Sequence, residues 1–204
     1  MPDFSIEKKL HNPVIGLDEV GRGPLAGPVI SCGCYFKNYT IHEDLYNLID
    51  DSKKLSEKKR IAAFKILQNL KKEGILDYHL GNANVEEIDT LNILEATKLS
   101  MKRVVDKFNI ENAFLIIDGN FSLNHKTFKE QSIIKGDDKS LSIAAASIIA
   151  KVHRDRLMKK LSIKYQYFGW EKNAGYGTKI HIKNIHRFGP TIHHRKTFEP
   201  IKSL

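Results

Sequence analysis

The sequence predicts an α/β fold, in which a mixed central β-sheet carries helices on its faces and a helical segment follows as a C-terminal extension. Two observations support this prediction. Short apolar runs of strand length alternate with longer segments whose apolar residues recur at helical spacing. From Gln166 onward the composition shifts to Gly, Tyr, Trp, His and Lys, with one more helix expected around residues 178–188.

The expected strands are short and rich in β-branched, aromatic and Cys residues. They cover residues 13–19, 28–36, 76–80, 113–117 and 132–134. Cys32 and Cys34, the only cysteines, alternate within the second strand, so their side chains share a face and are poorly placed for a relaxed disulfide. They are interpreted as small buried side chains in a protein of a reducing compartment.

Three helices are expected between these strands and before the C-terminal part. They cover about residues 56–72, 85–108 and 141–160. Ser56 and Asn84 are the expected N-terminal caps of the first two. The third helix begins with small residues, which let a helix press closely against a sheet. Arg154 and Asp155 on this helix are expected to form an ordinary surface or intrahelical charge pair.

The length of 204 residues suits one domain of generous size, or one domain with an appendage. We expect an N-terminal polar segment over residues 1–12, the α/β domain over 13–163 and a basic, mostly helical extension over 164–204 that closes the substrate groove. The first twelve residues lack the apolar core of a signal peptide, and no apolar run is long enough to span a bilayer. The expectation is a cytoplasmic protein with no membrane contact.

The charge of the chain favours a polyanionic partner. Lys and Arg total 33 against 24 Asp and Glu, a formal net charge of +9 at pH 7. Nucleic acid is the simplest such partner, although a basic protein without one remains the alternative.

Acids follow the apolar runs of three expected strands. They are the adjacent pair Asp18 and Glu19, then Asp118, then Asp137. Strand ends in α/β sheets cluster along one edge, so we expect these four carboxylates to converge. Like charges at one point repel unless cations lie among them, and two Mg²⁺ ions suit such a set. The alternative is that each acid is a capping or turn residue, especially Asp137, which shares its turn with Asp138.

Two glycine-flanked turns are candidates for substrate contacts. Gly21, Arg22 and Gly23 offer backbone N–H groups and a guanidinium that suit an anion such as a phosphate. Tyr176 lies between Gly175 and Gly177 and is expected to be exposed, where it could stack on a sugar or base. A tyrosine packed on the core is the alternative.

Further basic residues give weaker signals. Lys53 precedes a helix cap and could contact a phosphate backbone, with a solvated helix start as the equal alternative. Several His and Arg residues surround Tyr176 and are interpreted as surface or phosphate-contacting residues: His181, His186, Arg187, His193, His194 and Arg195. Their spacing matches no zinc pattern, and no cysteine accompanies them.

These segments, taken in order, resemble the type 2 ribonucleases H, and among them the bacterial ribonuclease HII family. The resemblance extends from about Val14 to Phe198. It rests on the stretches 16–28, 51–56, 85–89, 117–120, 135–137, 142–152, 175–178 and 194–195. A single Asp-Glu-x-Gly would be weak evidence, whereas the ordered series is very specific.

The resemblance implies a ribonuclease H-like fold and a metal-dependent endonuclease. Such an enzyme cleaves the RNA strand of RNA–DNA hybrids and incises at ribonucleotides embedded in duplex DNA, leaving 3′-OH and 5′-phosphate ends. By motif, the metal ligands for Mg²⁺ or Mn²⁺ would be Asp18, Glu19, Asp118 and Asp137. Gly21, Arg22 and Gly23 resemble the loop at the ribonucleotide 2′-OH, Tyr176 resembles a tyrosine that stacks on the following deoxyribose, and Lys53 lies in a lysine motif near the backbone.

The chain departs from the family pattern in minor ways. Asn84 stands where Ser is frequent, and Ala174 replaces a more usual Lys or His. The tail over 198–202 shows no convincing sliding-clamp motif, so we expect no obligate protein partner and a monomer. Two rival interpretations remain. One is an enzyme like ribonuclease HIII, which acts only on longer hybrids and carries an additional N-terminal domain. The other is an inactive nucleic-acid-binding protein on this fold.

Overall fold

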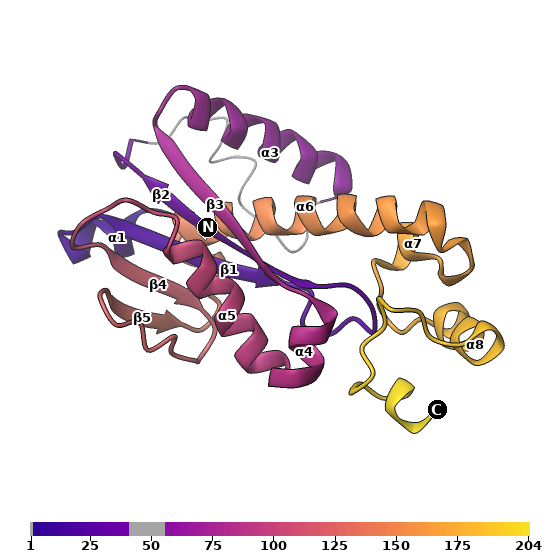
Figure 1. The fold of residues 1–204 in the computed structure, drawn as a ribbon. Helices are drawn as coiled ribbons and strands as arrows, with labels where there is room; N and C mark the ends of the chain where they lie inside the picture. The colour runs from indigo at the N-terminus through magenta and orange to yellow at the C-terminus, as the bar shows by residue number, and fades with distance from the viewer. Residues whose placement is uncertain (1, 41–55) are drawn as a thin grey trace.

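A mixed five-stranded sheet forms the centre of the part of the chain that the computed structural model describes, residues 2–40 and 56–204 (Figure 1). The strands are β1 (Val14–Val20), β2 (Val29–Phe36), β3 (Leu76–Ala83), β4 (Phe114–Asp118) and β5 (Lys129–Ile133), in the order β3-β2-β1-β4-β5. Strand β1 pairs antiparallel with β2 and parallel with β4. The prediction of a mixed sheet is confirmed.

Helices cover both faces of the sheet (Figure 1). The helices of the described residues are α1 (Ser5–Leu10), α3 (Glu57–Lys72), α4 (Val85–Leu91), α5 (Ile93–Val105), α6 (Leu141–Lys164), α7 (Trp170–Asn173) and α8 (Lys179–Phe188). Of these, α7 and α8 lie beyond the end of the sheet. Figure 1 shows α5 crossing one face and α3 with α6 on the other. Two apolar cores result, one between β2, α3 and α6 and one between β1, β4 and α5.

The contact between β1 and α6 is unusually close. A Cβ atom built on Gly16 would lie 2.5 Å from the backbone carbon of Ser142 and 2.6 Å from the nitrogen of Ile143. The small side chains expected in this helix, Ala144 to Ala146, are all fully buried. The sequence rule that small residues permit close packing therefore holds, and it brings the helix directly against the strand that carries Asp18.

Some predicted boundaries were wrong. The helix expected over 85–108 is interrupted at Asn92, whose φ of 72° leaves the helical region. Its side chain accepts hydrogen bonds from the nitrogens of Leu94 and Glu95, so it caps a second helix. Asn favours such local hydrogen bonds over a helix interior, which is why the pattern of apolar residues alone missed the break.

The N-terminal segment is more ordered than its polar composition indicates. Phe4, just before α1, is 1% exposed and packs edge-on against Phe36 of β2. Glu7 is fully buried, and its Oε1 accepts hydrogen bonds from the Ser140 hydroxyl and the Ser142 nitrogen. A carboxylate at the N-terminus of α6 also suits the positive end of that helix.

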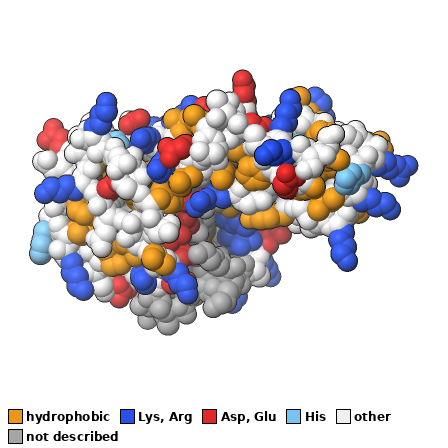
Figure 2. Space-filling model, turned by 90° about the horizontal axis from the view of Figure 1, so that it is seen from below, with side chains coloured by type: hydrophobic (Ala, Val, Ile, Leu, Met, Phe, Trp, Pro, Cys, Tyr) orange, Lys and Arg blue, Asp and Glu red, His pale blue; other side chains and the backbone are white. Residues whose placement is uncertain are grey.

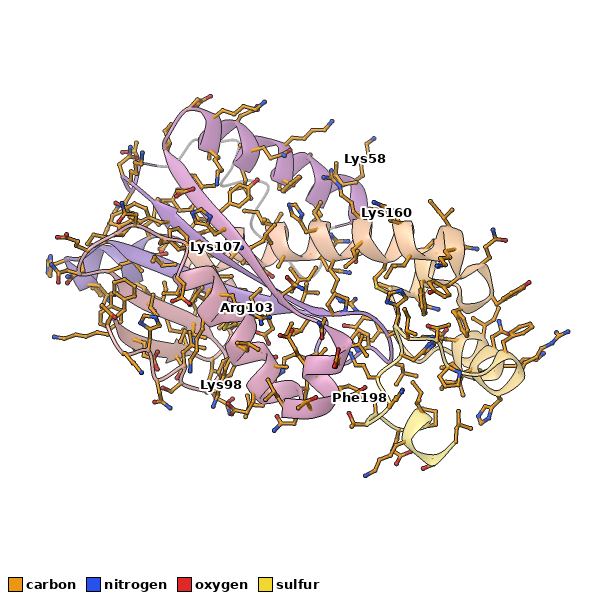
Figure 3. The ribbon with its side chains drawn as sticks, viewed as in Figure 1. Lys58, Lys98, Arg103, Lys107, Lys160 and Phe198 are labelled. Carbon is orange, nitrogen blue, oxygen red and sulfur yellow. The ribbon has the colours of Figure 1, made fainter. Side chains whose placement is uncertain are left out.

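The C-terminal extension shares an apolar core with earlier segments of the chain. Trp170 and Phe168 stack at 5.4 Å, and both belong to a cluster with Leu25 and Ala26, which follow β1, and with Met158 of α6. The chain then returns toward α4 and α5, where Phe198, labelled in Figure 3, packs against a small buried cluster. Among the described residues, no helix is both long and apolar enough to cross a membrane.

The close contact at Gly16 gives a stability test. Gly16→Ala should lower the free energy of unfolding by about 1–3 kcal/mol, because the added methyl group meets backbone atoms that cannot rotate away. Urea denaturation measures the change. Lys160→Ala, which truncates an exposed side chain of α6, is the control and should stay within about 0.5 kcal/mol of wild type. Equal stability of the Gly16 variant and the wild type would contradict the described packing.

Candidate active site

The parallel pairing of β1 and β4 brings Asp18 and Asp118 to the same end of the sheet. Leu17 is paired with Ile117, so the next residue of each strand is an aspartate at the same level. Asp18 is 4% exposed, whereas Asp118 is half-buried. The expectation that strand ends gather acids along one edge therefore holds for these two positions.

These acids line a cavity of about 350 Å³. Its described lining residues are Asp18, Glu19, Val20, Arg60, Asp118, Ser147, Lys151 and Tyr176. Four of the candidate residues therefore line the same cavity: Asp18, Glu19, Asp118 and Tyr176. Asp18 and Tyr176 are 158 positions apart in the sequence. The cavity combines acidic, basic and aromatic side chains, which suits a phosphate-containing ligand with an associated cation.

Burial and mutual repulsion destabilise the ionised forms of these carboxylates. Burial, with the nearby charges of Glu19 and Asp118, raises the pKa of Asp18 well above its usual value. Burial also raises the pKa of Glu19 to about 6, with Asp118 adding to the effect and Arg22 opposing it. A positive charge placed among these groups would favour their ionised forms.

The donor set fits a divalent cation. All three side chains offer carboxylate oxygens, the ligands that hard cations prefer. Glu19 Oε2 is buried without a hydrogen-bond partner among the described residues, while Oε1 lies 3.4 Å from Arg22. As the described side chains stand, no three of His, Cys, Asp or Glu are close enough together to hold an ion. Repulsion favours this separation, so a cation would have to draw the oxygens inward.

Asp137 does not line this cavity. It lies in the 3₁₀ turn Gly136–Asp138 after β5 and is 2% exposed. Its neighbour Gly136 donates its N–H to Asp118 Oδ1 at 2.7 Å, so the turn is tied to the carboxylate cluster. Three of the four acids that were expected to converge therefore line the cavity. The fourth, Asp137, is connected to them only through its neighbour Gly136, which hydrogen-bonds to Asp118. Lys53 lies outside the described residues.

Sequence analysis missed three polar residues of the cavity, Arg60, Ser147 and Lys151. The Ser147 side chain hydrogen-bonds to Asp18. Lys151 pairs with Asp155, which also lies 3.9 Å from Arg60. Ser147, Lys151 and Asp155 are four residues apart along α6, so a polar row on an otherwise small and apolar helix was the signal that could have identified them.

The loop that contains Gly21 to Gly23 is held by two buried arginines. Arg154, expected at the surface, is 0% exposed, and its guanidinium donates to the carbonyls of Pro28, Ala26 and Ala174 at 2.8–3.0 Å. A Cβ on Gly21 would lie 2.2 Å from Arg154 Nε, so glycine is required there. The surface interpretation was wrong because backbone carbonyls brought in by the fold replace water as hydrogen-bond acceptors.

Arg195, which lies in the C-terminal extension, also holds the glycine loop. It is 0% exposed and donates to the carbonyls of Gly21, Arg22 and Gly27. Burial lowers the pKa of Arg154 to about 10 and that of Arg195 to about 9, so both remain charged at neutral pH. The two guanidinium groups therefore fix the peptide planes of the glycine loop and place positive charge behind it.

Tyr176 faces this loop. Its side chain is 47% exposed, and a Cβ on Gly23 would lie 3.5 Å from Tyr176 Cε1. The expectation of an exposed tyrosine is confirmed, and its ring lies next to Gly23 and lines the carboxylate cavity. By contrast, His181 and His194 are fully buried, so their interpretation as surface or phosphate-contacting residues was wrong. The aromatic side chains around them exclude water.

Lys and Arg side chains surround the outline of the molecule in Figure 2, including the narrow end. Several are engaged in intramolecular contacts: Arg103, labelled in Figure 3, donates to the Asn82 carbonyl and to Glu87. Lys107 donates to the Leu80 carbonyl. The net positive charge is therefore a broad surface property and does not identify the site by itself.

The chain is similar to proteins of one known family over most of its length. The sequence profile of the family Ribonuclease HII matches residues 15–200. A ribonuclease HII of Wolbachia pipientis subsp. Culex pipiens is 49% identical over 203 residues, covering 100% of this chain and 98% of the relative. The crystal structure of ribonuclease H2 from Pyrococcus horikoshii superposes with a TM-score of 0.75 at 27% identity, covering 93% and 95% of the two chains. A Bst-RNase HIII structure in complex with Mn²⁺ has a TM-score of 0.65 at 19% identity, covering 94% of this chain and 68% of that one, and shows the fold alone.

The arginine contacts predict that the glycine loop depends on Arg195. Arg195→Met should lower the free energy of unfolding by about 2–4 kcal/mol, because three buried carbonyls lose a charged donor. Arg195→Lys should lose less, since it keeps the charge but not the planar fork. Arg187→Met, on an exposed side chain of α8, should stay within about 0.5 kcal/mol of wild type. A wild-type denaturation midpoint for Arg195→Met would disprove this role.

Proposed function

The chain belongs to the ribonuclease HII family of ribonuclease H-type hydrolases, and on that basis we propose that it is an endonuclease for RNA within a DNA duplex. It would cut the RNA strand of RNA–DNA hybrids and incise at single ribonucleotides embedded in duplex DNA, leaving 3′-OH and 5′-phosphate ends. The observation that carries this proposal is the cavity shared by Asp18, Glu19, Asp118 and Tyr176. It combines ligands for a cation with an exposed ring beside a glycine loop.

The ribonuclease H family depends on divalent metal ions, and we propose a site for two Mg²⁺ or Mn²⁺ ions at Asp18, Glu19, Asp118 and Asp137. Bound there, the cations would lower the pKa of an attacking water and offset the negative charge on the departing oxygen. The residues of the chain prepare this site. Ser147 orients Asp18, and the Gly136 N–H orients Asp118.

Basic side chains would hold the phosphate next to these carboxylates. Lys151 and Arg60 line the same cavity, and both lie within 4 Å of Asp155, which limits their freedom. Arg22 is exposed, and its guanidinium lies 3.4 Å from Glu19 Oε1. Charge-assisted contacts from such groups would give binding that weakens steeply with salt, as phosphate contacts do.

Discrimination of RNA from DNA would come from the glycine loop. Only the 2′-OH distinguishes the two sugars, and it both donates and accepts a hydrogen bond. The Arg22 carbonyl already accepts from Arg195, so backbone groups of Gly23 are the better candidates for contact with the 2′-OH. Tyr176, next to Gly23, would stack on the following deoxyribose.

An enzyme restricted to longer hybrids, as in ribonuclease HIII, is the second candidate. A catalytically inactive binding protein is disfavoured, because three acids line the cavity and the fourth is tied to it. We further propose that the protein acts as a monomer without an obligate protein partner. One panel of substrates separates the candidates: a DNA duplex with one ribonucleotide, an all-RNA strand paired with DNA, and plain DNA.

Removal of single carboxylates tests the ligand assignment. Asp18→Asn and Asp118→Asn should each lower turnover on the hybrid by at least about 100-fold with Mg²⁺, because several kcal/mol of stabilisation by the cation are lost. Duplex binding, measured by fluorescence anisotropy, should remain close to wild type. EDTA should abolish wild-type cleavage.

The neighbouring pair Asp137 and Asp138 provides a matched control. Asp137→Asn should also lose most activity, whereas Asp138→Asn should not, because Asp138 is exposed. Normal cleavage by Asp18→Asn or Asp118→Asn would show that the ligand assignment is wrong. Cleavage of the long hybrid alone would favour the second candidate.

Tyr176→Ala tests the stacking contact. We expect cleavage at a single embedded ribonucleotide to fall about 10-fold to 100-fold, in line with the free energy of one stacking contact, and cleavage of the long hybrid to fall much less. The ratio of kcat/KM values for the two substrates is the measurement. Tyr167→Ala is the control, because this tyrosine is 62% exposed but does not line the cavity. An equal loss on both substrates would exclude a junction role for Tyr176.

A further inference from the structure

A row of buried polar side chains runs beneath Tyr176 and takes no part in the proposed chemistry. Trp170, His181 and His194 are each 0% exposed. Trp170 Nε1 lies 3.0 Å from His181 Nε2, and His181 Nε2 lies 3.1 Å from His194 Nε2. Buried polar groups of this kind are costly unless every one has a correctly oriented partner.

The hydrogen-bond directions determine the proton position on His181. An indole N–H can only donate, so His181 Nε2 is an acceptor. The proton of the neutral ring must then be on Nδ1, which lies 2.8 Å from the Tyr176 carbonyl oxygen. His181 therefore donates to the main chain of the residue whose ring lines the catalytic cavity.

His194 supports the same arrangement. The Thr191 N–H donates to His194 Nδ1 at 2.8 Å, which leaves the proton of the neutral ring on Nε2, facing His181 Nε2. A second proton on His181 Nε2 would face two donors, so the His181 ring is neutral. A second proton on His194 Nδ1 would face the Thr191 N–H, so the His194 ring is neutral as well. Consistently, burial lowers the pKa of both histidines, that of His194 to about 4.

The row is continuous with the glycine loop. His194 forms an antiparallel bridge with Ala26, and the flanking hydrogen bonds join Gly27 to His193 at 2.9 Å and Arg195 to Leu25 at 2.9 Å. The segment after α8 thus connects the loop on one side with the turn of Tyr176 on the other. Both sides of the expected ribonucleotide pocket depend on it.

We propose that His181 is a positioning residue for recognition of the embedded ribonucleotide. By donating from Nδ1 to the Tyr176 carbonyl, it holds the turn so that the tyrosine ring faces Gly23 above the carboxylates. This inference rests on the proposed function, in which Tyr176 contacts the sugar after the ribonucleotide. His181 therefore serves selectivity for single ribonucleotides, because the carboxylates and their cations are held by β1, β4 and α6 and not by α8.

Two substitutions separate this role from a general contribution to folding. His181→Leu removes the donor, whereas His181→Asn keeps an N–H donor at the place of Nδ1. We expect His181→Leu to lower kcat/KM for the single embedded ribonucleotide about 3-fold to 10-fold relative to the long hybrid, the effect of one lost hydrogen bond. His181→Asn should restore most of the ratio. His186→Asn, an exposed histidine of the same helix, is the control and should match wild type.

A double mutant tests whether His181 acts through Tyr176. In a Tyr176→Ala background, His181→Leu should cause no further loss of selectivity, because the group that it positions is absent. An additive loss, or an equal loss on both substrates in the wild-type background, would overturn the inference. If Tyr176→Ala itself is unselective, the junction role of Tyr176 fails instead, which distinguishes the two failures.

The proton position can be measured without any variant. In ¹⁵N NMR spectra of the full chain at neutral pH, His181 should show the Nδ1–H tautomer with an unprotonated Nε2. A charged ring or the Nε2–H tautomer would overturn the inference even if every variant fails to fold.

Discussion

Repulsion among carboxylates held together at the end of the sheet is the constraint on which the rest of the structure depends. The parallel register of β1 and β4 places Asp18 and Asp118 at the same level of neighbouring strands, and Glu19 follows Asp18 in β1. Burial makes this arrangement more costly, as the raised pKa values of Asp18 and Glu19 show. Helix α6 packs so closely on β1 that the Ser147 side chain hydrogen-bonds to Asp18, which lowers the pKa of this carboxyl and offsets part of that cost.

The positive side of the site is built differently from the acidic side. Arg154 and Arg195 contribute no side chain to the cavity lining, yet their guanidinium groups bind the carbonyls of the Gly21–Pro28 loop from behind. Charged donors to carbonyls are stronger than neutral ones, so the loop is held in one conformation before any ligand arrives. A loop fixed in this way loses little entropy on binding, which favours selectivity for a small group such as a hydroxyl.

The C-terminal extension contributes directly to the candidate site. It supplies Tyr176 to the cavity, Arg195 to the glycine loop and His194 to the bridge with Ala26. Since α7 and α8 are short, their position depends on the aromatic core around Trp170 and on hydrogen bonds to the domain before them. In the proposed function, the side chains that would contact the substrate are thereby held next to the carboxylates that would bind the cations.

The sequence alone determined the mixed α/β architecture, the acids at the strand ends and the exposed tyrosine, because periodicity, turn residues and motifs are local properties of the chain. It could not reveal the break at Asn92, where one side chain outweighs the apolar pattern. Only the tertiary structure decided the burial of Arg154, Arg195 and His181, since their acceptors are carbonyls from elsewhere in the chain or a nearby turn. A polar side chain is exposed or buried according to which partners the fold brings to it, and that depends on three-dimensional contacts that spacing does not encode.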